Sequence, residues 1–318
     1  MRLVFTDWNT MSMNGDLSPD CFEPYAEVTK YPYTSPEDVI KNIGDAEMVL
    51  CNKTLIPNEV FCKCPNLRYI GVLATGYNTI DVDSASKHGV VVCNAGTYST
   101  MAVAQHTFAM ILYYYNKISL YDVDVRKDAW KHSPQFSYFP YSTMELTGKT
   151  LSVIGYGGIG RQVAKIGEAF GMRVIVSTRT MPKDCPFELV SLEQAFKEAD
   201  VLTIHTPLTP DTANMVCWER LKTMKPTAML VNTARGGIVI EKDLARALQQ
   251  GIIAYAAIDV LQEEPMTTTP LDGLSNCLIT PHIAWTPYET RKRLLDISLE
   301  NVKSFLQGTP QNVVSVKI

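Results

Sequence analysis

The chain has 318 residues, of which 46% are hydrophobic and 19% charged, and its formal net charge at pH 7 is -4. This length suits two domains, and the composition is that of an ordinary soluble globular protein without the basic excess that nucleic-acid binding requires. No apolar run approaches the roughly 20 residues of a membrane helix, and the start of the chain is typical of a strand rather than a signal peptide. We therefore expect a cytoplasmic protein that binds neither nucleic acid nor membrane.

Eight cysteines are scattered along the chain, several of them in apolar, strand-like runs. This distribution favours free thiols over a disulfide framework. Cys62 and Cys64 form the only close pair, and neither a second pair nor a histidine at suitable spacing accompanies them. The sequence predicts no metal site.

The first third of the chain alternates short strand candidates with helical stretches. The strands are expected at residues 3–6, 48–51, 69–74 and 90–93, and the helices near 36–43 and 81–88. Such alternation is typical of a small α/β unit with a parallel sheet.

A long helical pattern at residues 100–115 is apolar almost all round, which predicts a helix buried between two bodies and places the domain crossover there. His106, on this helix, is expected to be a hydrogen-bonded core residue. Residues 121–143 then form an aromatic-rich segment that we expect to be irregular. We expect its aromatic side chains to pack either against a second subunit, which would make the protein a homodimer, or against their own domain.

From residue 148 onward the strand and helix alternation resumes, and it predicts a doubly wound parallel sheet. A helix at residues 287–306 is expected to cross back to the first domain, and residues 312–316 have strand character. The strands are expected at residues 150–155, 173–177, 201–205, 228–232, 253–258 and 277–280.

A glycine-rich turn follows the first of these strands and opens a helix, with the sequence Gly155-Tyr156-Gly157-Gly158-Ile159-Gly160. In this setting the pattern predicts a dinucleotide site. Gly155 would allow the tight turn, Gly157 the approach of a pyrophosphate, and Gly160 close packing of helix on strand. The alternative is a glycine-rich turn without a ligand.

The next strand decides which dinucleotide is expected. An acidic residue usually ends this strand and binds the ribose hydroxyls, but here Ser177, Thr178, Arg179 and Thr180 follow one another. Hydroxyls and a guanidinium suit a 2′-phosphate, so NADP is slightly favoured over NAD. Arg179 as an ordinary surface cation, with NAD held by the hydroxyls, is the alternative.

Three later segments place polar side chains directly after apolar strands, where open α/β sheets bind their ligands. They are residues 232–237, 257–265 and 280–285.

Taken with these segments, the chain resembles the D-isomer-specific 2-hydroxyacid dehydrogenase family, and most closely its glycerate dehydrogenase (hydroxypyruvate reductase) branch. The resemblance covers nearly the whole chain. Besides the glycine turn and the three segments, it rests on residues 74–78 with Asp81, Asn94 with residues 98–100, 103–106 and 145–150.

The resemblance implies two Rossmann-like domains, each with a doubly wound parallel sheet. A flavodoxin-like, substrate-binding domain would comprise residues 1–99 and 287–318, and an NAD(P)-binding Rossmann domain residues 100–286.

The resemblance also implies residue roles. Arg235 matches the arginine that binds the substrate carboxylate and keto oxygen, Glu264 the carboxylate partner, and His282 the acid/base. The chemistry agrees, because a histidine donates a proton readily near neutral pH and an arginine fork matches a carboxylate. Implied cofactor contacts are Gly155, Gly157, Gly158, Ile159, Gly160, Ser177, Thr178, Arg179, Thr206, Pro207, Thr233, Ala234, Arg235, Asp259 and His282; implied substrate contacts are Ala74, Thr75, Gly76, Arg235, His282 and Trp285.

The expected function is therefore reduction of hydroxypyruvate, and of glyoxylate, to the D-2-hydroxy acid by hydride transfer from NAD(P)H. Two alternatives stay open. One is another D-2-hydroxyacid dehydrogenase, of the D-lactate or phosphoglycerate type. The other is a nucleotide-sensing, corepressor-like binding module without turnover.

Overall fold

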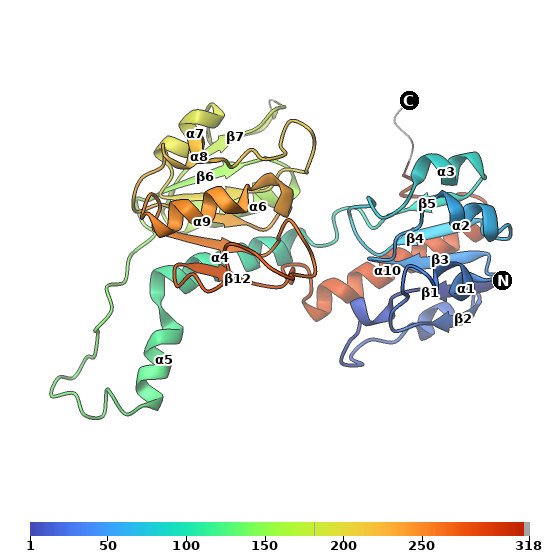
Figure 1. The fold of residues 1–318 in the computed structure, drawn as a ribbon, viewed down its shortest axis with the longest axis horizontal. Coiled ribbons are helices and arrows are strands. Elements are labelled where there is room, and N and C mark those ends of the chain that lie inside the picture. The colour runs from blue at the N-terminus through green and yellow to red at the C-terminus, as the bar shows by residue number, and fades with distance from the viewer. Residues whose placement is uncertain (181, 315–318) are drawn as a thin grey trace. The chain divides into compact units, whose positions relative to one another are not determined.

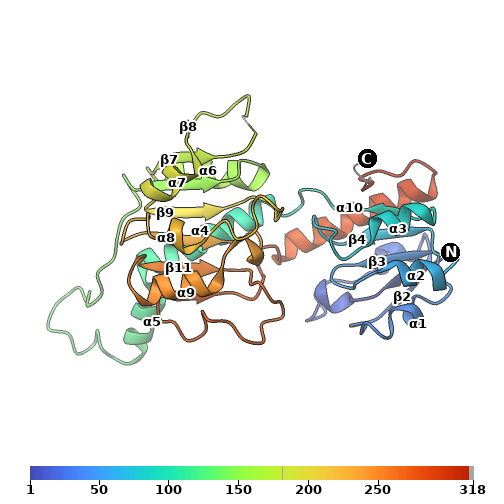
Figure 2. The same cartoon turned by 45° about the horizontal axis from the view of Figure 1, so that its top comes forward.

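A computed structural model describes residues 1–180 and 182–314. The chain forms two compact units, each built around its own parallel sheet (Figures 1 and 2). Unit 1 comprises Met1–Ser99 and Thr286–Ile318, and unit 2 comprises Thr100–Trp285.

Unit 1 contains a five-stranded parallel sheet in the order β2-β1-β3-β4-β5. This order is that of flavodoxin-like folds, as expected. The strands are β1 (Arg2–Phe5), β2 (Glu27–Lys30), β3 (Met48–Cys51), β4 (Tyr69–Val72) and β5 (Val91–Cys93); two short 3-10 helices, η1 (Trp8–Thr10) and η2 (Asp20–Phe22), follow β1.

Helices cover both faces of this sheet because successive side chains of a buried strand point to opposite sides. One face packs on α1 (Val39–Ile43), α2 (Asn58–Lys63) and α3 (Val82–Lys87). On the other face lies α10 (Tyr288–Leu306), whose Phe305 ring stacks obliquely on Tyr69 with 4.8 Å between ring centroids.

Two elements of unit 1 were missed by the sequence analysis. β2 is an edge strand with half-exposed side chains, so it lacks the apolar run that marked its neighbours. α2 is only six residues long and begins after Pro57. In the tail, Val313 forms a single antiparallel bridge with Cys93; residues 315 and 316 of the expected strand lie outside the described residues.

Unit 2 contains a seven-stranded parallel sheet in the order β12-β11-β10-β9-β6-β7-β8. The six expected strands are present, and the two-residue β8 extends one edge. The doubly wound fold is thus confirmed. The strands are β6 (Thr150–Ile154), β7 (Arg173–Ser177), β8 (Glu188–Leu189), β9 (Val201–Ile204), β10 (Met229–Asn232), β11 (Tyr255–Ile258) and β12 (Cys277–Ile279).

The two faces of this sheet pack on different helices. α4 (Thr100–Asn116) and α6 (Gly158–Ala169) cover one face, with Val153, Val231 and Ala257 beneath them. The opposite face packs on α7 (Leu192–Glu198), α8 (Trp218–Leu221) and α9 (Glu241–Gln249). A 3-10 turn, η3 (Gly236–Ile238), precedes α9.

The aromatic segment differs from its prediction at its beginning. Residues 121–126 belong to helix α5 (Ile118–Arg126), in which the Arg126 Nε atom lies 2.8 Å from the Asp122 carboxylate. This pairing, four residues apart on one helix face, favours a helix. α5 and residues 127–143 extend away from the sheet of unit 2 as an arm (Figure 1), and Leu146 is again buried in its core.

Candidate functional site

The sheet of unit 2 has its topological switch point between β6 and β9. From β6 the chain proceeds outward through β7 and β8, and from β9 it proceeds the other way through β10, β11 and β12. In open α/β sheets ligands bind at the carboxyl ends of the strands beside such a point. The predicted cofactor and catalytic residues of this unit lie in turns at that edge.

The glycine turn packs directly against the backbone that follows the neighbouring strand β9. A Cβ atom on Gly155, whose φ is +91°, would lie 2.5 Å from the carbonyl oxygen of His205, just after β9. A Cβ on Gly160 would lie 2.0 Å from the Gly155 carbonyl oxygen, so α6 packs on the turn only because that side chain is absent. Around Gly157, by contrast, nothing lies within 4 Å of the Cβ position.

This cradle fits a dinucleotide. The open side at Gly157 faces the start of α6, and the first N–H groups of a helix have no partner within it and attract anions. Gly158 and Ile159 are the first two residues of that helix. The turn therefore has the shape and the hydrogen-bond donors that a pyrophosphate requires.

The residues predicted to bind the cofactor ribose become more exposed from Ser177 to Arg179. Ser177 is the last residue of β7 and is buried, Thr178 is half-buried, and the Arg179 side chain is 83% exposed. An ion pair of 3.8 Å joins Arg179 to Asp211. Thr206 and Pro207 follow β9, and the Thr212 hydroxyl donates to the Pro207 carbonyl at 2.7 Å.

At the other end of the site, His282 and Glu264 meet. The His282 Nδ1 atom lies 2.7 Å from Glu264 Oε2, and both side chains are about one-third exposed or less, at 26% and 34%. Because the carboxylate accepts from Nδ1, that nitrogen carries a proton, and Nε2 is left as the ring nitrogen available to a ligand.

The turn bearing His282 is strained and firmly held. His282 has a φ of +55°, which is unusual for a residue with a side chain. Its N–H donates to the Asp259 carbonyl at 2.8 Å and to the Thr280 carbonyl at 3.0 Å. The Asp259 carboxylate, 1% exposed, accepts from the N–H groups of Ile283 and Ala284 at 2.9 and 3.0 Å.

Several effects act on the Asp259 carboxylate. Burial alone would raise its pKa, but hydrogen bonds from His106, Thr280 and the two backbone N–H groups outweigh burial and lower the pKa below its ordinary value. The carboxylate is therefore ionised, and in this structure it holds the His282 turn. Its contact with a nicotinamide stays a prediction.

Arg235 lies on a turn braced by a buried amide. Asn232, fully buried at the end of β10, donates to the Arg235 carbonyl at 3.0 Å and accepts from the Ala234 N–H at 3.0 Å. The exposed Arg235 guanidinium donates to the Ala234 carbonyl at 2.7 Å. Thr233 is buried, with its hydroxyl 3.3 Å from that of Thr107 on α4.

A second buried carboxylate fixes the loop that carries Glu264. Glu241, at the start of α9, is 7% exposed and accepts from the Gln262 N–H and the Thr269 hydroxyl, each at 2.6 Å. Glu264 itself accepts from the Leu261 N–H at 3.0 Å.

The predicted substrate loop, residues 74–76, lies in unit 1 after β4. Asn94, which follows β5, donates to the Thr75 carbonyl at 2.7 Å, and the Thr75 hydroxyl donates to the Gly96 carbonyl. Thr75 is exposed, whereas Ala74 and Gly76 are half-buried. The remaining predicted substrate residue, Trp285, is half-buried at the end of unit 2.

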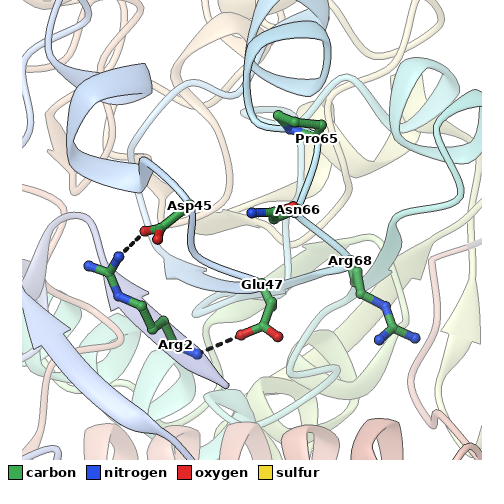
Figure 3. A pocket seen from close by; sticks show the side chains of 6 residues that line it. All are labelled: Arg2, Asp45, Glu47, Pro65, Asn66 and Arg68. Atoms are coloured by element: carbon green, nitrogen blue, oxygen red, sulfur yellow. Dashed lines mark hydrogen bonds and ion pairs between the residues drawn. The ribbon is translucent and has the colours of Figure 1, made fainter.

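A hollow of about 480 Å³ lies elsewhere on unit 1 and is lined by Arg2, Asp45, Glu47, Pro65, Asn66 and Arg68 (Figure 3). These residues border the amino ends of β1, β3 and β4, opposite the edge at which such sheets bind ligands. Arg2 pairs with Asp45, and its backbone N–H donates to Glu47 at 2.7 Å. We interpret the hollow as a structural feature of the sheet edge.

Other classes of site find little support. Within residues 1–180 and 182–314, no group of three or more His, Cys, Asp or Glu side chains is placed to hold a metal ion, and the eight cysteines are unbonded to one another. None of the helices in this part of the chain is both long and apolar enough to span a membrane.

Three polar side chains that shape the site were missed as functional residues: Asn232, Glu241 and Thr280. A signal existed in each case. Asn232 and Thr280 are polar residues directly after apolar strands, and Glu241 begins a helix after an apolar run. What the sequence does not reveal is which distant backbone groups these side chains reach.

Comparisons with known proteins identify the relatives of this chain. Residues 108–284 match the family model described as D-isomer specific 2-hydroxyacid dehydrogenase, NAD binding domain. The chain is 40% identical to a hydroxypyruvate reductase of Blautia hydrogenotrophica, over 99% of this chain and all of the relative. It is 39% identical to a glycerate dehydrogenase of Methylorubrum extorquens, over 91% of this chain and 92% of the relative.

Among solved structures, an acyclic imino acid reductase (Bsp5) in complex with NADPH and D-Arg superposes with a TM-score of 0.85 and 29% identity. The match covers 99% of this chain and all of that one. Sequence, fold and site agree on an NAD(P)-dependent oxidoreductase, and the chain belongs to the family of D-isomer specific 2-hydroxyacid dehydrogenases.

Proposed function

We propose that this protein reduces hydroxypyruvate, and also glyoxylate, to D-glycerate and glycolate with a reduced nicotinamide dinucleotide. The observation that carries the proposal is the 2.7 Å pair of His282 Nδ1 and Glu264 Oε2, in the same unit as the turn bearing Arg235. The names of the two relatives, a hydroxypyruvate reductase and a glycerate dehydrogenase, support the choice of substrate.

Reduction of a 2-keto acid requires a hydride on carbon and a proton on oxygen. The reduced nicotinamide supplies the hydride when it is bound. His282 then donates a proton from Nε2 to the forming alkoxide, and the negative charge of Glu264 stabilises the imidazolium before that transfer. Arg235 binds the substrate carboxylate with its planar fork and draws electron density from the keto oxygen.

The two units divide this work. We assign substrate binding to residues 1–99 and 287–318, with Ala74, Thr75 and Gly76 of the loop after β4 as its proposed contacts. Residues 100–286 would bind the dinucleotide. The bulk of the Trp285 side chain, in the segment after His282, would favour acids of two or three carbons.

For the coenzyme we propose a slight preference for NADPH. None of the residues 178–180, directly after β7, is a carboxylate that could bind the ribose hydroxyls, and Arg179 is exposed and only distantly paired with Asp211. Thr178 and Ser177 add hydroxyl groups beside it. Together these side chains suit a 2′-phosphate, with NADH as the weaker alternative.

The initial rate of hydroxypyruvate reduction, with NADH and NADPH in parallel, tests the proposal. We expect fast turnover with hydroxypyruvate and slower turnover with glyoxylate, pyruvate and 3-phosphohydroxypyruvate. A preference for pyruvate or the phosphorylated acid would move the assignment to the D-lactate or phosphoglycerate type. Tight dinucleotide binding without turnover on any acid would instead support a binding module.

We also propose that the arm of residues 118–143 forms a homodimer interface. α5 contains no buried residue, and Trp130, Phe136 and Phe139 are 50%, 94% and 72% exposed. Exposed groups of large apolar side chains mark interaction sites, and aromatic residues are enriched at interfaces. The Tyr138 and Tyr141 hydroxyls both donate to Asp124, so the arm is braced from within before it meets a partner.

Light scattering after gel filtration tests this second proposal. We expect a mass of two chains, and a mass of one chain for the double variant Phe136→Asp, Phe139→Asp. The matched control is Tyr33→Asp, an exposed aromatic position of unit 1, which should leave the dimer intact. A monomeric wild-type protein would show that the arm has another role.

A further inference from the structure

His106 lies on α4 and faces the turn that carries His282. Its Nε2 atom is 3.1 Å from the Thr280 hydroxyl oxygen and 3.5 Å from Asp259 Oδ1, although the three residues are far apart in the sequence. All three belong to unit 2. The His106 side chain is 19% exposed.

The direction of each hydrogen bond follows from the number of protons available. The Thr280 hydroxyl has one proton, which it donates to Asp259 Oδ1 at 2.6 Å. Its oxygen therefore accepts from the Nε2–H of His106. This gives a directed chain from His106 through Thr280 to the carboxylate of Asp259, with two shorter contacts than the direct approach of His106 Nε2 to Asp259 Oδ1 at 3.5 Å.

That carboxylate is also the group that holds the His282 turn. Oδ1 accepts from the Ile283 N–H and Oδ2 from the Ala284 N–H, so both residues after His282 are fixed by the same side chain. The left-handed conformation of His282 costs free energy, and it persists only where the surrounding structure determines it. The hydrogen bond to Thr280 fixes the hydroxyl that in turn orients Asp259.

We propose that His106 is a positioning residue for His282, acting through Thr280 and Asp259 without contacting substrate. The inference rests on the proposed function, because it assumes that His282 is the proton donor. His106, which the sequence analysis expected to be a hydrogen-bonded core residue, would thereby contribute to the reaction.

The decisive variants remove or retain the donor. His106→Leu removes the N–H group, whereas His106→Gln places an amide N–H near the position of Nε2. We expect His106→Leu to lower kcat about tenfold with the KM for NADPH unchanged within about twofold, since a misplaced acid slows the proton transfer but not cofactor binding. His106→Gln should recover kcat to within about threefold of the wild type.

Thr280→Val tests the chain independently of His106 and keeps the shape of the side chain. If the two residues act through one hydrogen-bonded chain, their losses should not multiply. The kcat of the double variant His106→Leu, Thr280→Val should then lie within about twofold of the kcat of the slower single variant. Hydrogen exchange gives a readout without turnover. Both single variants should lose protection of the amides of residues 283 and 284, measured in a peptide spanning residues 280–286.

Met110→Ala is the matched control, because Met110 is a buried residue of the same helix. It should lower the unfolding temperature while leaving kcat and the protection of residues 283 and 284 unchanged. A wild-type kcat in His106→Leu, with His282→Ala inactive, would overturn this inference and leave the proposed function standing. Multiplying losses in the double variant would also overturn it. Absence of turnover in the unmodified protein would overturn the proposed function and the inference with it.

Discussion

The two ends of the site in unit 2 share one sheet edge but are built differently. After their proposed roles, we call the turns bearing Arg235, Glu264 and His282 the catalytic end and residues 177–179 the ribose end. Each turn of the catalytic end is held by a polar side chain that is 7% exposed or less: Asn232, Glu241 and Asp259. At the ribose end, Arg179 is 83% exposed and its pair with Asp211 spans 3.8 Å.

The difference follows from what each end has to do. Proton transfer requires donor and acceptor at a fixed distance and angle, so a small displacement is costly. Recognition of a phosphate requires charge and hydrogen-bond donors, and an exposed arginine can reorient as the ligand arrives. Substitutions at the catalytic end should therefore change kcat, and those at the ribose end should change KM.

The largest effect is expected at His282. His282→Ala removes the proton donor but leaves the glycine turn intact, so kcat should fall about 10²- to 10⁴-fold while the Kd for NADPH stays within about twofold. Steady-state rates and titration of nicotinamide fluorescence measure the two quantities. His88→Ala, at an exposed histidine of unit 1, is the control and should be unaffected. Near-normal turnover of His282→Ala would remove the proton-donor assignment.

Glu264→Gln should have a smaller effect of the same kind. The amide can still accept from the Leu261 N–H, so the loop is retained, but the negative charge facing His282 is lost. We expect kcat to fall about 10- to 100-fold, measured under saturating hydroxypyruvate. Glu263→Gln changes the adjacent, exposed carboxylate and should leave kcat unchanged. Equal losses in the two variants would indicate a general effect of loop charge.

The same two ends differ in how far the sequence predicts them. The apolar runs that became β6, β7 and β9 to β12 marked the sheet, because a strand covered on both faces is composed mostly of apolar residues. Polar residues in the turns after these strands were predicted as site residues because open α/β sheets bind their ligands at the carboxyl ends of the strands. The helix α5 was missed because its pattern is half-polar and none of its residues is buried.

The braces at the catalytic end could not be predicted in the same way. Asp259 reaches residues 283 and 284, and Glu241 reaches Thr269, over 20 or more positions of the sequence. No periodicity of a strand or helix encodes which backbone N–H a carboxylate meets after folding. The exposed Arg179, whose role depends on a ligand, needed no such information and was predicted from its position after β7 alone.

At the ribose end, Arg179→Ala should raise the KM for NADPH about tenfold and change the KM for NADH less than twofold, because only the former carries the 2′-phosphate. Parallel initial-rate measurements with the two coenzymes give the ratio. Asp211→Asn is a control with an effect of opposite sign. The Asp211 carboxylate competes with the 2′-phosphate for Arg179, so its removal should lower the KM for NADPH slightly. If Arg179→Ala raised both KM values equally, the arginine would have no role in choosing the coenzyme.

The smallest effect concerns His205, which follows β9 at the switch point between the two ends. Both of its ring nitrogens are buried, and neither has a hydrogen-bond partner among residues 1–180 and 182–314. Burial without a partner lowers the pKa of His205 from 6.5 to about 3. Between these two values the unfolded chain binds a proton that the native protein excludes, so the free energy of unfolding must fall as the pH falls from about 6.5 toward 3.

The slope attributable to one such group is at most about 1.4 kcal/mol per pH unit. Urea unfolding at several pH values between 7 and 4.5 measures it, and the comparison with His205→Gln isolates it from the titration of carboxylates, which both proteins share. The variant's absolute stability is free to differ; only its pH dependence should be shallower. If the free energy of unfolding changed with pH equally in both proteins, His205 would acquire a proton in the native state. The structure around His205 would then rearrange to accept that charge, as the exposed Arg179 can reorient at the ribose end, and would not be fixed like the turns of the catalytic end.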